Sequence, residues 1–478
     1  MDPSLPPSKP VTTEELLAVI AAQQAQIATL MARVAELERR LGLNSTNSSK
    51  PSSSDGLNKP GRRISSMRQA SGKKPGGQEG HVGKTLRQVD NPDKVVDHYP
   101  EQCRRCSAAL NETMATDYQK RQVFDLPEPP PLQVTEHRAH VCCCSSCGTK
   151  TVGQFPDGVT AAAQYGAVIT ATIVYLQILH HIPEDRVVEI MHDLFKIDLA
   201  AGTVGAMVTR TAENFADVAA AIGDRVRTTA VKHMDETGLR VGGKLLWLHV
   251  ASTCLLTFYR VAIQRGAMMS DVVGTIIHDC WGPYFTMPGV LHGLCNAHLL
   301  RELQALMEFE KEPWAFAMAR FLRQACHAIH LAQERKTTLK PSFVQYMLAR
   351  YDCIVSRGLN YHEAQAPPES QSSAGKKRRG RTKKRVGHNL VIRMRDHRES
   401  VLRFLTDPAV PFTNNQAEQD VRMMKVRQKV SGGFRSMSGA EAFATLRSVV
   451  STARKQGIAI LDTLVQDPAL FLQKLKTA

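Results

Sequence analysis

The sequence lacks an uninterrupted apolar run of about 18 residues, so we expect no membrane span. It also lacks a secretory signal, because its first residues, M-D-P-S-L-P-P-S, are polar and rich in proline. Without such a signal, the eleven cysteines are interpreted as thiols or metal ligands and not as a disulfide framework. These absences lead us to expect a cytoplasmic protein.

Acidic residues are in the minority. The chain of 478 residues has 45 Asp and Glu against 61 Lys and Arg, which gives a net charge of +16. A polyanionic partner is expected for so basic a chain. The length predicts about three domains, and 43% hydrophobic residues are enough to build a substantial core.

Residues 1–45 are predicted to contain a coiled-coil helix. Between residues 14 and 41, apolar residues recur every seven positions: Ile20, Ile27, Val34 and Leu41 at one core position, and Leu16, Gln23, Leu30 and Leu37 at the other. Branched residues at the first position and mostly Leu at the second favour a parallel two-stranded coiled coil. The chain would then form a homodimer or a larger oligomer. The alternative is a single amphipathic helix that packs on its own chain.

Residues 46–96 form a basic Ser/Pro/Gly linker by composition. Residues 97–155 then predict a small β-rich, zinc-ribbon-like module with one structural Zn²⁺. Two Cys-x-x-Cys pairs, Cys103 with Cys106 and Cys144 with Cys147, have the spacing of a tetrahedral zinc site. The neighbouring Cys142 and Cys143 leave open which thiolates bind, and a set of buried reduced cysteines is the alternative.

Residues 156–225 are predicted to be helical, either as a DNA-binding helix-turn-helix or as a plain helical bundle. Residues 226–300 predict three consecutive strands, a helix, a fourth strand that ends at Asp279, and a further strand. This order indicates a mixed α/β sheet. The region from about 300 to 395 is predicted as a helical and basic insertion, and residues 456–478 as a C-terminal helical tail.

Three acidic residues carry most of the functional information: Asp235, Asp279 and Glu418. Asp235 lies in a predicted strand that runs out into a turn, and Asp279 ends another strand. Glu418 lies on a predicted helix that Thr413 or Asn414 could cap. Two strand-end aspartates and a helical glutamate can converge on two divalent metals, the arrangement used in phosphodiester cleavage and transfer. Isolated acidic residues are more often solvated surface residues, so their sequence context has to support this interpretation.

Basic residues are concentrated in two segments. Eight of the ten positions 376–385 are Lys or Arg, and a second basic segment follows Glu418. Both are predicted to contact the phosphates of DNA, although a solvated basic loop is the alternative for the first. The predicted DNA-binding residues are Lys376, Lys377, Arg378, Arg379, Arg381, Lys383, Lys384, Arg385, Arg422, Lys425, Arg427, Lys429 and Arg435.

Together these motifs resemble one family, the DDE transposases of bacterial insertion sequences of the "IS sixty-six" type. The resemblance depends on the two Cys-x-x-Cys pairs and on N-S-S-K-P-S-S-S-D, G-G-Q-E-G-H-V-G, D-E-T-G, D-C-W-G-P-Y, C-N-A-H-L-L-R-E-L, N-N-Q-A-E-Q-D-V-R and K-V-S-G-G-F-R-S, in this order along nearly the whole chain. One position departs from the family: Gln419 stands where Arg commonly follows the glutamate.

The resemblance implies a multidomain protein whose residues 226–455 form a ribonuclease-H-like core with a helical insertion. It implies that Asp235, Asp279 and Glu418 are catalytic and hold two Mg²⁺ or Mn²⁺ ions. Cys295 and His298 resemble a Cys-x-x-His pair found after the second aspartate in several such families, with either a packing or an auxiliary role. The implied partners are DNA, both the ends of the element and the target, and small accessory proteins of the same element. When bound to DNA, the protein would be associated with the nucleoid. Two alternatives stay open: a zinc-dependent DNA-binding protein with an inactive core, and a nuclease without strand transfer.

Overall fold

The computed structural model describes residues 12–48, 86–126, 132–267, 269–365 and 384–476. The chain divides into two compact units. The smaller comprises Ser65–Ala162 and Met191–Ile197, and the larger comprises the rest of the chain. Each unit is described here by itself.

The larger unit is built on a five-stranded mixed sheet. Its strands are β3 (Val231–Val241), β4 (Lys244–Ser252), β5 (Thr257–Ala262), β6 (Gly274–His278) and β7 (Val290–Leu294). They lie in the order β5-β4-β3-β6-β7. Strands β3, β4 and β5 follow one another through short turns and pair antiparallel, whereas β6 and β7 run parallel to β3. The sequence pattern predicted these five strands and their mixed α/β character.

Two predictions about this sheet were wrong. We expected a helix between the third and fourth strands, but the described residues from 263 to 273 contain no helix. We also expected the first strand to end near Asp235, but β3 continues to Val241 and Asp235 lies within it.

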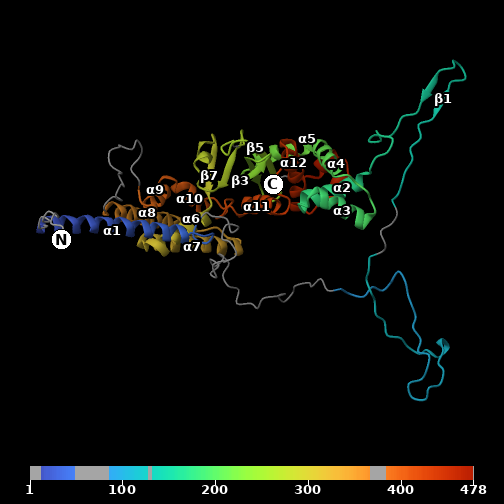
Figure 1. Cartoon of the computed structure of the whole chain (residues 1–478), viewed down its shortest axis with the longest axis horizontal. Coiled ribbons are helices and arrows are strands. Elements are labelled where there is room, and N and C mark those ends of the chain that lie inside the picture. Colours follow the sequence, from blue (N-terminus) through green and yellow to red (C-terminus); the bar gives the residue numbers. More distant parts are fainter. Residues whose placement is uncertain (1–11, 49–85, 127–131, 268, 366–383, 477–478) are drawn as a thin grey trace, which may run out of the picture. The chain divides into compact units, whose positions relative to one another are not determined.

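Helices surround the sheet in two groups (Figure 1). The first group packs with β3, β4 and β5 around one hydrophobic core, and comprises α2 (Ala167–Val174), α4 (Ala201–Asn214), α5 (Ala216–Thr228), α11 (Asn415–Val430), α12 (Met437–Lys455), α13 (Ile460–Val465) and α14 (Pro468–Lys474). The π-helical turn η3 (Tyr175–Leu179) continues α2, and α3 spans Glu184–Phe195.

The second group packs on the other end of the sheet. Ile277 of β6 and Leu294 of β7 join a separate core. Its helices are α6 (Asn296–Ala305), α7 (Pro313–Glu334), α8 (Pro341–Glu363), α9 (Val386–Asp396) and α10 (Arg398–Thr406), with the π-helical turn η5 (Leu306–Glu310) after α6. All of these helices lie in the sequence between β7 and α11, so α11 returns to the sheet only after this long excursion.

Helix α1 (Thr13–Gly42) begins with a capping box, in which Thr12 and Glu15 exchange hydrogen bonds. Its apolar residues, including Ile20, Ile27 and Leu30, are about half exposed. In the described part of the chain, α1 is the one helix that is long and apolar enough, by length and composition alone, to cross a membrane. The structure contains one copy of the chain, so the coiled coil stays a prediction.

The smaller unit holds little regular structure within its described residues: the 3-10 turn η2 (Glu112–Met114) and an antiparallel pair, β1 (Val141–Cys143) with β2 (Lys150–Val152). The predicted β-rich character is therefore limited to this ladder and one isolated bridge between Gln102 and Ala109. Most of the linker predicted at 46–96 lies outside the described residues.

Candidate active site

The register of the parallel strands β3 and β6 brings two aspartates to the same level of the sheet. Val231 pairs with Thr275 and His233 with Ile277. Asp235 lies two residues beyond His233 in β3, and Asp279 lies two residues beyond Ile277, directly after β6, so an extension of this register places them at the same level. Successive residues of a strand point to opposite faces, which separates Asp235 from its neighbour Glu236.

Asp235 is partly buried among other carboxylates. Burial raises the pKa of its carboxyl group well above the usual value, and the negative charges of Glu236, Asp279 and Glu418 raise it further. Three acidic side chains from β3, from the end of β6 and from α11 therefore act on one another. Such a concentration of negative charge is unfavourable without a compensating cation, and carboxylate oxygens are the ligands that hard divalent cations prefer.

Asp279 is held at the end of β6 by its own loop. Its Oδ1 accepts a hydrogen bond from the backbone N–H of Trp281 at 3.0 Å. The preceding residue, His278, is fully buried and its ring stacks on Tyr284 with the ring centroids 4.5 Å apart. Burial lowers the pKa of His278 to about 3, so the ring is neutral at pH 7. The stacked rings of His278 and Tyr284 therefore lie next to Asp279 in the sequence and limit the movement of its backbone.

Glu418 is oriented by Asn414, which stands at the N-cap of α11 but does not cap the helix with its side chain. Instead the Asn414 Nδ2 donates to the carbonyl of Met234 at 2.8 Å, and its Oδ1 lies 2.9 Å from the His233 Nδ1. The backbone N–H of Asn414 donates to the Cys295 Sγ at 3.2 Å. Asn414 is buried, and it fixes the start of α11 against the strand that carries Asp235.

Helix α6 presents a row of polar side chains to Glu418. The Cys295 Sγ and the His298 Nδ1 each lie 3.5 Å from the Glu418 Oε1. The Arg301 Nη2 lies 3.8 Å from the other oxygen, Oε2. These residues are spaced three apart, which places them on one face of a helix. Cys295 and His298, which the sequence analysis singled out as auxiliary residues, therefore meet the third acidic residue directly.

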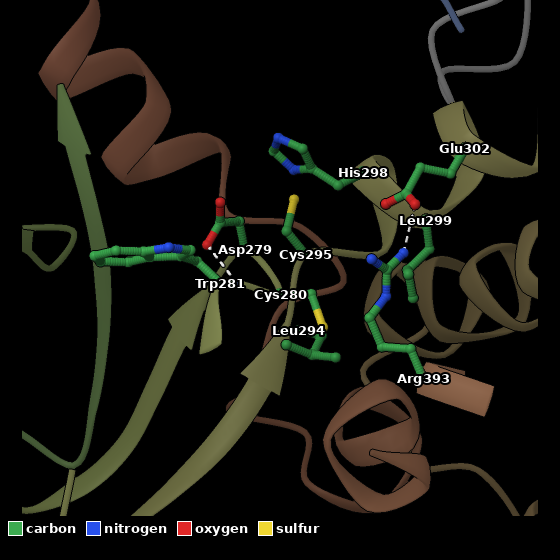
Figure 2. Close-up of a pocket in the computed structure, with 9 residues that line it drawn as sticks. All are labelled: Asp279, Cys280, Trp281, Leu294, Cys295, His298, Leu299, Glu302 and Arg393. Atoms are coloured by element: carbon green, nitrogen blue, oxygen red, sulfur yellow. Dashed lines mark hydrogen bonds and ion pairs between the residues drawn. The ribbon is translucent and has the colours of Figure 1, made fainter. Parts of the chain in front are cut away.

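A cavity of about 210 Å³ opens beside Asp279. It is lined by Asp279, Cys280, Trp281, Leu294, Cys295, His298, Leu299, Glu302 and Arg393. Figure 2 shows Cys295 between Asp279 and His298, with the ion pair of Glu302 and Arg393 on the opposite side. The cavity therefore offers acidic, basic and aromatic groups next to the proposed reacting centre.

Glu236 has a partner set of its own on the opposite face of β3. Its side chain is only 2% exposed, and it accepts hydrogen bonds from the Tyr284 hydroxyl at 2.5 Å and from the Arg265 Nη2 at 2.7 Å. The Arg265 guanidinium also lies over the rings of Trp281 and Trp247, 4.0 Å and 5.0 Å from their centroids. Arg265 lies in the loop before β6, and Trp281 and Tyr284 follow β6, so these contacts join the two loops.

The predicted DNA-binding residues have varied surroundings. On α11, Arg422 and Lys429 are exposed and Lys425 is partly exposed; their spacing of three and four residues continues the face of Glu418. Arg427 differs, because its guanidinium lies 3.7 Å from the centroid of the Phe434 ring. Burial lowers its pKa to about 10. It is therefore packed against the protein.

The turn after α11 is fixed to the end of β3. The Phe434 N–H donates to the Arg240 carbonyl at 2.8 Å, and a Cβ on Gly433 would lie 2.9 Å from that same oxygen. Only glycine fits this close approach. Arg435 follows and is exposed. Lys384 and Arg385 are partly exposed at the start of α9, whereas the predicted contacts Lys376, Lys377, Arg378, Arg379, Arg381 and Lys383 lie outside the described residues.

The two Cys-x-x-Cys pairs form matching turns. The Cys103 N–H donates to the Ala108 carbonyl, and the Ser107 N–H donates to the Cys103 carbonyl, both at 2.9 Å. Cys144 makes the same two bonds with Thr149 and Gly148, again at 2.9 Å. Hydrogen bonds within each turn lower the pKa of the Cys103 and Cys147 thiols. Each pair is thus shaped as half of a zinc site, but the structure does not gather the four sulfurs into one group.

Several residues of the site were not predicted from the sequence: Arg301, Glu302, Arg393, Arg265 and Tyr284. Asn414 was predicted only as a possible helix cap. Arg301 and Glu302 belong to the same C-N-A-H-L-L-R-E-L segment as Cys295 and His298. Helical spacing from Cys295 would have placed them on the same face. The contacts of Asn414 and Arg393 join segments far apart in the chain, and no local pattern indicates them.

Known families and proteins are similar to parts of this chain. A family model described as "Transposase IS66 family" matches residues 162–442, which is more than half of the chain. A second model, a family of unknown function called DUF6444, matches residues 4–87. An uncharacterized protein of Sinorhizobium fredii, y4jO, is 30% identical over 97 residues. That match covers 19% of this chain and only 30% of the length of the relative.

Proposed function

The chain belongs to the IS66 family of transposases, and we propose that it cuts DNA at the ends of an insertion sequence and joins those ends to target DNA. The observation that carries this proposal is that Asp235 of β3 is aligned with Asp279 after β6 and feels the charges of both Asp279 and Glu418 of α11, which add to burial in raising the pKa of its carboxyl group. Their mutual electrostatic effect fits a shared catalytic role.

The topology supports a ribonuclease-H-like core. Counted along the chain from β3, the sheet has the order 3-2-1-4-5, with three antiparallel strands followed by two that run parallel to the first. Helices α6 to α10 would be the insertion before the helix that bears the glutamate. This is the arrangement that the resemblance to DDE transposases implies.

The three carboxylates fit a pair of Mg²⁺ or Mn²⁺ ions, because carboxylate oxygens are the ligands that these ions prefer, and because burial and the neighbouring negative charges raise the pKa of Asp235, which a bound cation would offset. When bound, two such ions supply activation of the attacking oxygen and stabilisation of the leaving oxygen in an in-line displacement. Asp235, Asp279 and Glu418 would hold them. Asn414 fixes the start of α11, the helix that carries Glu418, against β3, and the backbone N–H of Trp281 donates to the Asp279 carboxylate.

The surroundings of the site favour DNA as the substrate. The exposed residues Arg422 and Lys429 continue the face of Glu418 along α11, and Arg435 follows the turn. We propose that these residues, with Lys425 and the basic segment at 376–385, hold the phosphates on either side of the scissile bond. Arg427 would instead stabilise the turn through Phe434.

The remaining parts would organise the complex. We propose that α1 pairs chains through its heptads, so that two element ends are brought together. The two knuckles would hold one structural Zn²⁺ through Cys103, Cys106, Cys144 and Cys147. The helices between residues 156 and 225 would contribute to DNA binding, and small accessory proteins would join the assembly.

The test is Mg²⁺-dependent joining of labelled element ends to a plasmid by the purified full-length chain. Asp235→Asn, Asp279→Asn and Glu418→Gln preserve shape and remove charge, so each should lower cleavage and joining by at least about 100-fold, the scale seen when electrostatic stabilisation of a transition state is lost. Binding to DNA without metal should be retained, because basic residues elsewhere provide it.

Glu236→Gln is the matched control. It also removes a carboxylate from β3, but from the opposite face, where Arg265 and Tyr284 can still donate to the amide oxygen. It should retain most of the activity. The proposal fails if any of the three variants joins DNA at a normal rate. Cleavage without joining by the unmodified chain would indicate a nuclease, and DNA binding without either reaction would indicate an inactive core.

A further inference from the structure

Cys295, His298 and Glu418 form a compact group of metal-ligating atoms. The Cys295 Sγ, a ring nitrogen of His298 and a carboxylate oxygen of Glu418 all lie within 4.8 Å of one another, and this is the one such group in the described part of the chain. The sulfur and the nitrogen are each 3.5 Å from the Glu418 Oε1. Ligands on a tetrahedral zinc ion are roughly 3.3–3.7 Å apart, as follows from bond lengths of about 2.0–2.3 Å.

The protein directs these three atoms at one another. The Cys295 N–H donates to the His278 carbonyl at 2.9 Å, and its sulfur receives the Asn414 N–H at 3.2 Å. The His298 Nδ1 is buried and has no hydrogen-bond partner among the described residues. The Arg301 Nη2 lies 3.8 Å from the Glu418 Oε2, whereas the sulfur and the imidazole lie beside Oε1. Backbone bonds and an unpartnered ring nitrogen make this a preformed site.

We propose that Cys295, His298 and Glu418 bind a thiophilic divalent cation, with Zn²⁺ as the chemically matched ion. A sulfur, an imidazole nitrogen and a carboxylate suit zinc, whereas Mg²⁺ takes oxygen ligands. On binding, the Cys295 thiol releases its proton to solvent and the sulfur forms a bond to the metal. The fourth position would face the cavity that Cys295, His298 and Asp279 line.

Zinc at this site would inhibit DNA joining. This consequence depends on the proposed function, because it follows from the catalytic role of Glu418. A carboxylate bound to zinc beside Cys295 is withdrawn from the metal pair that it would share with Asp235 and Asp279. Zinc and Mg²⁺ would therefore compete for the same glutamate.

The binding test uses the full-length chain, loaded with Zn²⁺ and freed of excess metal. The unmodified protein should hold about one more zinc per chain than Cys295→Ser or His298→Ala, measured by elemental analysis. Any zinc bound by the two Cys-x-x-Cys pairs is the same in all three proteins, so it does not contribute to the difference in zinc content. With Co²⁺ in place of Zn²⁺, the thiolate-to-metal absorption band of this site should be lost in Cys295→Ser. Circular dichroism of each variant checks that it is folded.

Cys326→Ser is the matched control. Cys326 is also buried, and its sulfur lies 4.0 Å from the His330 Nδ1, but no carboxylate of the described residues completes a group there. Its zinc content should equal that of the unmodified chain. Equal zinc in the unmodified protein, Cys295→Ser and His298→Ala would overturn the proposal.

The inhibition test separates this site from the proposed function. Added Zn²⁺ should slow Mg²⁺-dependent joining by the unmodified protein and by Cys326→Ser, and should slow Cys295→Ser less. Zinc bound at Cys295 without any inhibition would leave the site in place and contradict the catalytic role of Glu418. Absence of the additional zinc while Glu418→Gln is inactive would reject the site alone.

Discussion

At the scale of single residues, Asn414 has the largest structural role outside the three acidic residues. Its side chain joins α11 to β3, and its backbone N–H bonds to the sulfur of Cys295. The orientation of Glu418, one helical turn later, depends on these bonds. The amide is buried, so its bonds cannot be replaced by water.

Asn414→Ala should therefore lower both stability and activity. The substitution leaves the Met234 carbonyl without its donor, which costs about 1–3 kcal/mol for a buried polar group. Denaturant unfolding should report this loss, and joining of DNA ends should slow because Glu418 is less well held. Asn415→Ala, at the exposed next position, is the control and should change neither measurement. Equal stability of the two variants would show that the Asn414 bonds are dispensable.

The sequence indicated the acidic residues but not what positions them. Asp235 and Asp279 follow from strand patterns, because neighbouring parallel strands align residues at the same level. Asn414 was interpreted, as an alternative to Thr413, as a helix cap from its place before α11, since Thr and Asn are both favoured capping residues. Its actual partners, His233 and Met234, are far away in the sequence, and only the packing of α11 on β3 brings them together.

At the scale of elements, the sheet was predictable and one connection was not. The three hairpin strands and the two later strands each show apolar patterns bounded by turn residues. The segment before β6 was expected to be helical, but Arg265 in that segment packs between two indole rings and pairs with Glu236. These long-range contacts override the local preference of the segment. The positive φ of Gly274, 82°, then allows β6 to begin against the Ala230 carbonyl.

The predicted zinc-binding module, residues 97–155, can be tested directly by its metal content. Two matching knuckles predict about one zinc per chain on Cys103, Cys106, Cys144 and Cys147. A Cys103→Ser/Cys106→Ser double variant should lose that zinc in elemental analysis. It should also make residues 97–155 sensitive to protease, because formation of a zinc site and folding of a small module are coupled. Cys254→Ser, an exposed cysteine elsewhere, should lose none. Full zinc content in the double variant would place the ligands elsewhere.

At the scale of the whole molecule, we propose that the exposed apolar face of α1 pairs chains with one another. Leu16, Ile20, Ile27 and Leu30 are each about half exposed in a single chain, which is unfavourable unless another surface covers them. The heptad spacing favours a second copy of the same helix. A complex that joins two DNA ends needs at least two chains near each other.

Removal of residues 1–45 should therefore lower the oligomeric state measured by light scattering, while the zinc content stays unchanged. Ile27→Asp, a charge at a single core position, should act in the same direction with the chain otherwise intact. Arg33→Glu, at an exposed position outside the two core positions, should keep the oligomer. An unchanged mass after the truncation would remove the coiled coil from this account.

The net charge of +16 belongs to the whole molecule, but salt dependence can locate the charges that contact DNA. Each phosphate contact contributes roughly 0.9 to the slope of log affinity against log salt concentration. Replacing residues 376–385 with Gly and Ser should flatten that slope if this segment holds phosphates, and Arg422→Gln with Lys429→Gln should flatten it further. Replacing Lys474 and Lys476 near the C-terminus removes charge from the last helix and the residues after it, and should leave the slope as it was. An identical slope in the first variant would show that residues 376–385 only raise the net charge, and a slope that Arg422→Gln with Lys429→Gln leaves unchanged would remove the face of α11 from the contacts to DNA.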